Sequence, residues 1–175
     1  MKNKPLLLAG IYSLIYIVST LFFYTTERFS NLNMVYLLAM ALILPMVILT
    51  IKIERDETNR GYISGREAVK AGMRFVLYST LILMLFQAIF YYSGWREFKI
   101  NALPSYVRER ALELDKMGKR KFDEKQLQVA ISEELKNITL FKELTFVFFR
   151  CIFLGLFSSF MASIFMKRAR PSNVN

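Results

Sequence analysis

Apolar residues along this chain gather into four runs that contain no charged residue: 5–26, 29–51, 75–95 and 151–166. About 20 helical residues cross a bilayer core that is roughly 30 Å thick. Inside lipid the backbone must satisfy its own hydrogen bonds, so each run is expected to be helical. The pattern predicts an all-α integral membrane protein with four transmembrane helices.

The predicted spans cover residues 5–24, 34–51, 73–94 and 144–166, within a single membrane domain over residues 1–175. Two lysines precede the first run, as they do in a signal peptide. That run is too long for the apolar region of a signal peptide, and no small-residue cleavage pattern ends it. The first span is therefore expected to be retained.

Four spans place both termini on one side of the membrane, together with the loop over 52–74. This side carries eleven basic and four acidic residues, whereas the opposite side carries twelve basic and ten acidic residues. Lys and Arg in short loops mark the cytoplasmic side. We therefore expect both termini in the cytoplasm.

The segment 95–143 is the longest stretch outside the predicted spans. Ser105 is suited to cap a first helix that Gly118 would end, and Asp123 with Gln126 is suited to start a second. Apolar residues recur at helical spacing in both parts. The segment predicts an extracytoplasmic amphipathic helical hairpin over about 105–139, which either covers the bundle and the interface or docks a partner.

The composition narrows the possible chemistry. The chain has no histidine and one cysteine, Cys151, which lies in an apolar run, so histidine-dependent triads, histidine–metal sites and an internal disulfide are excluded. The net charge of +10 does not predict nucleic-acid binding, because the basic residues flank membrane-length runs and face lipid headgroups there. No catalytic residue, metal site or cofactor is predicted.

Two intramembrane features remain. Small residues recur every fourth position on the fourth span as a candidate helix-packing stripe: Cys151, Gly155, Ser159 and Ser163. We expect this stripe to pack against another helix of the same chain. The alternative is that it packs between chains.

Arg150 is the only charged residue in the interior of a predicted span, since Arg74 stands at the very start of the third, and residue counting brings Gln87 and Ser19 to its depth. We predict a candidate polar cluster of these three residues, with no carboxylate at that depth. Arg150 is expected either to snorkel to the headgroups or to bond to the Gln87 carbonyl, and the bonded state is favoured.

The order of these features resembles a family of four-span inner-membrane proteins of Bacteroidota, domain-of-unknown-function family 4199. The resemblance is carried by Arg55-Asp56-Glu57, Gly61-Tyr62-Ile63-Ser64, Gly72, Ile100-Asn101, the outer hairpin, Gly155 and Lys167-Arg168. The family has Ile-Asn-Pro where this chain has Ile100-Asn101-Ala102-Leu103-Pro104. The resemblance implies an inner-membrane location and no established activity, catalytic residue or cofactor.

The sequence therefore predicts a non-enzymatic structural or accessory protein that binds membrane lipids or a membrane-protein partner. The alternative is a small transporter or channel subunit that acts as a homo-oligomer at the level of Gln87 and Arg150. A membrane enzyme is expected to gather several acids, or a nucleophile and a base, at one depth, and the sequence shows no such group.

Overall fold

The structure is a computed structural model that describes residues 4–26, 32–118 and 122–168. Its main body is a bundle of four long helices: α1 (Lys4–Thr25), α2 (Leu32–Ile53), α3 (Gly65–Phe90) and α6 (Leu140–Met166). All four regions are long and apolar enough to cross a membrane, as the sequence predicts. Within the described ranges the chain is all-helical apart from turns and one isolated bridge.

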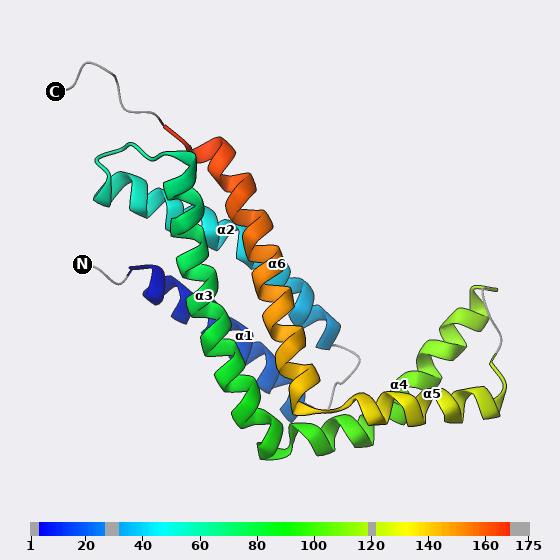
Figure 1. Cartoon of the computed structure of the whole chain (residues 1–175). Helices are drawn as coiled ribbons and strands as arrows, with labels where there is room; N and C mark the ends of the chain where they lie inside the picture. The colour runs from blue at the N-terminus through cyan, green and yellow to red at the C-terminus, as the bar shows by residue number, and fades with distance from the viewer. Residues whose placement is uncertain (1–3, 27–31, 119–121, 169–175) are drawn as a thin grey trace.

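Helices α3 and α6 run side by side along the bundle, with α1 against α3 and α2 against α6 (Figure 1). The described ends of the chain and the α2–α3 connection lie together at one end, called here the terminal end (Figure 1). At the opposite end, called the hairpin end, α3 continues into α4 (Arg96–Lys116), and α5 (Glu124–Asn137) leads back into α6.

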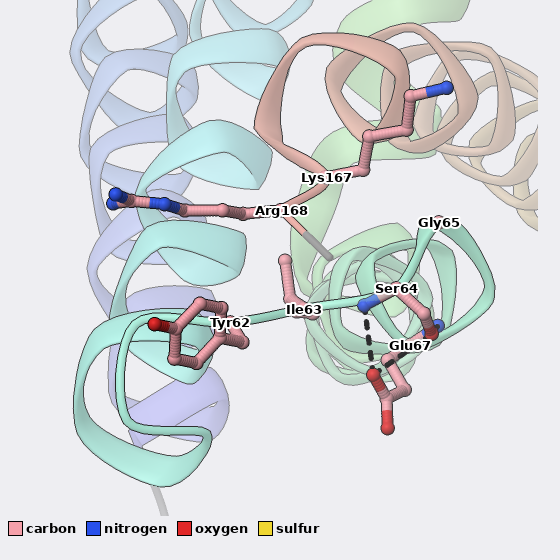
Figure 2. A pocket seen from close by; sticks show the side chains of 7 residues that line it. All are labelled: Tyr62, Ile63, Ser64, Gly65, Glu67, Lys167 and Arg168. Atoms are coloured by element: carbon pink, nitrogen blue, oxygen red, sulfur yellow. Dashed lines mark hydrogen bonds between the residues drawn. The ribbon is translucent and has the colours of Figure 1, made fainter. Parts of the chain in front are cut away.

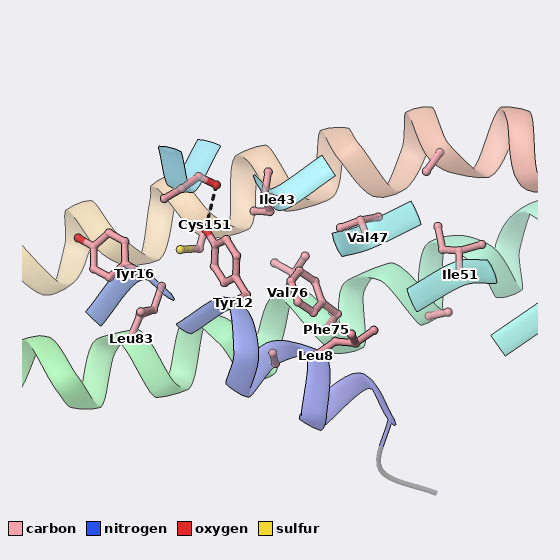
Figure 3. Close-up of a cluster of buried hydrophobic side chains, with 14 of the residues drawn as sticks. Leu8, Tyr12, Tyr16, Ile43, Val47, Ile51, Phe75, Val76, Leu83 and Cys151 are labelled. Carbon is pink, nitrogen blue, oxygen red and sulfur yellow. Dashed lines mark hydrogen bonds between the residues drawn. The ribbon is translucent and has the colours of Figure 1, made fainter. Parts of the chain in front are cut away.

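The buried side of each bundle helix forms one apolar core (Figure 3). Tyr12 of α1 packs edge-on against Phe75 of α3, and its hydroxyl donates to the carbonyl of Ala39 on α2 at 3.2 Å. Val47 and Ile51 of α2 are fully buried beside them. Three helices are thus joined through one tyrosine, while the large exposed apolar side chains of the bundle face outward, where lipid surrounds a membrane bundle.

The small residues of α6 form a close seam with α3. Cys151, Gly155, Ser159 and Ser163 are all buried on this face of α6. A Cβ atom placed on Gly72 of α3 would lie 2.4 Å from the Ser159 hydroxyl oxygen, and one placed on Gly155 would lie 2.4 Å from a methyl carbon of Val76. The predicted stripe therefore packs within the chain, and the two backbones approach so closely that a side chain has no room.

The terminal end is closed by local backbone contacts. After α2 comes a π-helical turn, η2 (Glu54–Thr58), and then a tight turn with Gly61 at φ 86°. Ser64 caps α3 in a reciprocal capping box with Glu67. Ile63 then pairs with Arg168 in an antiparallel bridge, with N···O distances of 3.0 and 2.9 Å. The start of α3 is thus fastened to the end of α6.

The hairpin differs from its prediction at its start. No helix begins at Ser105, because α4 already begins at Arg96 and continues through Pro104. The proline removes the backbone donor that would bond the Ile100 carbonyl, and the neighbouring Ser105 hydroxyl donates to the Ala102 carbonyl at 2.8 Å. The other predicted signals hold: α4 stops just before Gly118, at φ 67°, and Asp123 with Gln126 forms a capping box.

A sharp elbow joins α3 to α4. It consists of the turn η3 (Tyr91–Trp95), in which Gly94 has a φ of 115° that residues with a side chain rarely adopt. A Cβ on Gly94 would also lie 2.8 Å from the Tyr24 hydroxyl oxygen. The elbow turns the chain sideways, so α4 and α5 extend away from the bundle and do not fold across its end (Figure 1).

Candidate functional site

Arg150 lies inside the bundle, on the part of α6 nearer the hairpin end. It is only 8% exposed. Three aromatic rings surround its guanidinium, whose central carbon lies 4.8 Å from the ring centre of Tyr36, 5.1 Å from Tyr16 and 5.4 Å from Phe146. These rings come from α1, α2 and α6, so one cation is shared by three helices. We call this group of four residues the arginine cage.

The rings satisfy only part of what this cation requires. Each desolvated cation–π contact contributes about 2 kcal/mol, whereas an ion in a protein interior costs several kcal/mol in lost hydration. The terminal nitrogens Nη1 and Nη2 are fully buried and find no hydrogen-bond partner in the described part of the chain. An unmet buried donor costs about 1–3 kcal/mol. The rings of the cage therefore stabilise the charge of Arg150, but they accept no hydrogen bond from Nη1 or Nη2.

Gln87 does not join Arg150, contrary to the predicted pairing. The Gln87 amide donates to one carboxylate oxygen of Glu143 at 3.3 Å, and Lys99 donates to the other at 2.6 Å. The prediction placed the start of the fourth span at residue 144, which left Glu143 outside the membrane. Helix α6 begins at Leu140, so Glu143 points back to the level of Gln87. A carboxylate is therefore present at the level of Gln87, two helical turns from Arg150 along α6.

Ser19 also stays apart from the arginine cage. It is half-buried on α1, and no hydrogen bond joins it to Arg150 in the structure. The contact from α1 comes instead from Tyr16, one helical turn closer to the terminal end. Counting residues inward from the span ends gives depth only to within about one turn, and this is enough to select the wrong side chain.

Sequence reasoning missed Glu143 and the three rings of the cage. A usable signal was present on α6, because Glu143, Phe146 and Arg150 follow one another at helical spacing and share a face. Tyr16 and Tyr36 had no such signal, since they belong to other helices whose rotation the sequence does not specify.

An aromatic cluster supports the hairpin where it leaves the bundle. Trp95 is buried and stacks between Phe90 and Phe98 at ring distances of 5.0 and 5.5 Å, with Tyr24 of α1 at 6.3 Å. Lys99, which bonds Glu143, lies over the Trp95 ring at 5.2 Å. Aromatic residues of this kind collect at membrane–water interfaces, and here they fix the root of the hairpin to α1 and α6.

An apolar groove of about 390 Å³ runs between α4 and α5. The facing stripes of the two helices meet only partly, so Val107, Leu114 and Leu127 are half-buried in it, and only Leu103 and Ile131 are buried. Arg110 and Glu134 also line the groove. The two helices alone thus do not fully bury their apolar faces.

A second pocket, of about 670 Å³, lies at the terminal end (Figure 2). It is lined by the cap of α3 and by Lys167 and Arg168, and the Arg168 guanidinium lies 5.9 Å from the ring centre of Tyr62. Lys167 and Arg168 point in different directions there, so the pocket does not bring the two cations together (Figure 2).

These features define a helical membrane-protein class: a tightly packed bundle of four helices of spanning length that carries a sideways helical hairpin. The chain matches the family model described as Protein of unknown function (DUF4199) over residues 6–168, and it belongs to that family. No curated protein and no solved structure matches it.

Proposed function

We propose that this protein is a non-enzymatic accessory protein of the bacterial inner membrane, with both termini in the cytoplasm and the hairpin on the extracytoplasmic side. The positive charge around the terminal end supports this orientation. In this proposal the hairpin is the binding arm, and its groove takes an amphipathic helix of a membrane-protein partner.

The open groove of the hairpin carries the proposal. Helices α4 and α5 extend sideways, so the bundle does not cover the apolar side chains that they leave half-buried (Figure 1). An amphipathic helix that lies in such a groove completes the packing of both helices. Because the hairpin leaves the bundle at the aromatic cluster around Trp95, this arm is held at the level of the membrane surface.

Site-specific photocrosslinking in cells tests the arm. A photoreactive residue at Ala130, in the groove, is compared with one at Val129, the next residue, which is 56% exposed and outside the groove. We expect a protein adduct from position 130 and none from position 129. Equal adducts at both positions, or adducts to lipid alone at position 130, would show that the groove is not a protein-docking site.

A second candidate, a subunit of an oligomeric transporter or channel, is favoured by one observation: the buried, unpartnered guanidinium of Arg150. The α3–α6 seam supports the accessory role instead, because Gly72 and Gly155 leave no space between these helices. The oligomeric state in lipid nanodiscs, together with ion flux in vesicles, separates the two. A closed ring of subunits with Arg150-dependent flux would favour the transporter.

A further inference from the structure

We propose that the arginine cage is a phosphate-binding site at the hairpin end of the bundle, and that Arg150 is its ligand-binding residue. The guanidinium of an arginine stays protonated at physiological pH. Its Nη1 and Nη2 atoms are buried and unpartnered among the described residues. A buried cation in this state requires an anion.

The described residues supply no such anion. Glu143 is the acid nearest to Arg150 along α6, two turns away, and both of its carboxylate oxygens are already bonded, one to Lys99 and one to Gln87. The rings of Tyr16, Tyr36 and Phe146 attract a cation but offer no carboxylate. The counter-charge for Arg150 therefore has to come from outside the described chain.

Of the three rings that contact the guanidinium, that of Phe146 is the most exposed. Phe146 lies one turn closer to the hairpin end than Arg150, and it is 53% exposed although its ring contacts the guanidinium. It also packs edge-on against Tyr36, with ring centres 5.8 Å apart. In this proposal, rotation of the Phe146 ring gives phosphate access to Arg150, because exposed side chains change rotamer within nanoseconds.

The free atoms of Arg150 specify the kind of anion. Two terminal nitrogens in one plane match two oxygens of the same oxyanion, which is the geometry in which arginine binds phosphate. A membrane surface presents phosphate as lipid headgroups, and the surrounding water presents it as the free ion. Both sources have the same binding chemistry. The site is separate from the hairpin groove, so it does not depend on the proposed docking role.

Thermal unfolding of the full chain in an uncharged maltoside detergent tests the site. One arm adds phosphatidylglycerol, with an uncharged galactosyl diacylglycerol as control, and the other adds inorganic phosphate, with chloride at equal ionic strength as control. We expect phosphatidylglycerol to raise the Tm by roughly 5–10 °C at about 100 times its Kd. A rise in the first arm alone identifies a lipid headgroup, and a rise in both shows that free phosphate suffices. Equal Tm values with each control would overturn the proposal.

Two variants assign the effect to Arg150. Arg150→Gln should abolish the rise, whereas Arg108→Gln, an exposed arginine of the hairpin, should keep it. Persistence of the full rise in Arg150→Gln would overturn the proposal. Phe146→Ala provides a test should Arg150→Gln not fold, since it keeps the cation and removes its cover. We expect this variant to reach half of its Tm rise at a severalfold lower concentration of the phosphate compound that raises the Tm of the unmodified protein. An unchanged half-maximal concentration would also overturn the proposal.

Discussion

Gly155 of α6 lies directly against Val76 of α3. A Cβ on Gly155 would come within 2.5 Å of both methyl carbons of Val76. One turn along each helix, Gly72 of α3 stands in the same relation to Ser159 of α6. At each of these two levels, a glycine of one helix thus faces a larger residue of the other. Dispersion contacts between such closely spaced backbones hold membrane helices together, since lipid supplies little hydrophobic driving force between helices.

Gly155→Ala should destabilise the bundle, because the new methyl group overlaps Val76 and forces the helices apart. The expected loss is about 1–3 kcal/mol, the usual cost of overpacking. Gly10→Ala is the matched control, as nothing lies within 4 Å of a Cβ at this position of α1. Reversible unfolding in mixed micelles measures both. Equal stability of the two variants would contradict the close seam.

The same seam predicts a rescue. Adding Val76→Ala to Gly155→Ala should recover part of the lost stability, because it removes the two methyl groups that the new Cβ meets. Contacting residues commonly couple by about 0.5–3 kcal/mol. A double variant whose loss equals the sum of the single losses would show that the two positions do not touch.

Glu143→Gln should destabilise the hairpin end by about 1–3 kcal/mol, since it leaves the Lys99 ammonium largely buried without its counter-charge. The side chains of this pair are only 17% and 14% exposed. In the control Glu124→Gln, the lost partner is Arg108, and both side chains are more than half exposed. That change should cost less than about 1 kcal/mol. A comparable loss in both variants would mean that burial does not strengthen the Lys99 bridge.

Arg150→Leu and Gln87→Leu should act additively on stability, to within about 0.5 kcal/mol. The reason is that Gln87 bonds Glu143, while the guanidinium of Arg150 lies among rings. A double-mutant cycle from unfolding free energies measures the coupling. A coupling energy clearly above that value would restore the direct bond between the two residues that the sequence suggests.

Gly94→Ala should change the angle between the hairpin and the bundle. Its φ of 115° disfavours a side chain, and the Tyr24 hydroxyl occupies the place of a Cβ. Distances between spin labels on exposed cysteines introduced at Leu85 and Lys125 report the angle, and the native Cys151 is buried. Gly65→Ala is the control, because this first residue of α3 has no positive φ and nothing lies within 4 Å of a Cβ there. It should leave the distance unchanged, and the same distance in Gly94→Ala would contradict the fixed elbow.

Cysteines placed singly at Thr58 and Met117 should react with an impermeant reagent from opposite sides of the membrane. Both residues are exposed, at opposite ends of the bundle. In intact cells only Met117→Cys should label, because the charge distribution favours a cytoplasmic terminal end. Labelling of Thr58→Cys from outside would reverse the orientation.

The sequence was informative wherever a local rule applies. Charge-free runs, the capping boxes at Ser64 and Asp123 and the stop before Gly118 specify the helices, because they act within a few neighbouring residues. The surroundings of Arg150 escaped prediction. Which rings face it depends on the rotation of α1 and α2 about their axes, and the nearly uniform apolar composition of these helices gives no preferred face.

The continuity of α3 with α4 has a mechanical consequence. No long loop separates them, since the elbow is the short segment Tyr91–Trp95, with a kink at Ser93 and Gly94, and the Tyr24 hydroxyl lies against that glycine. A load applied to the hairpin therefore passes as torque into α3. That helix cannot rotate alone, because Gly72 and Gly155 lock it to α6 and the Ile63–Arg168 bridge holds its far end. A force on the hairpin at one end of the bundle is thus transmitted to the paired helices α3 and α6 at the other end.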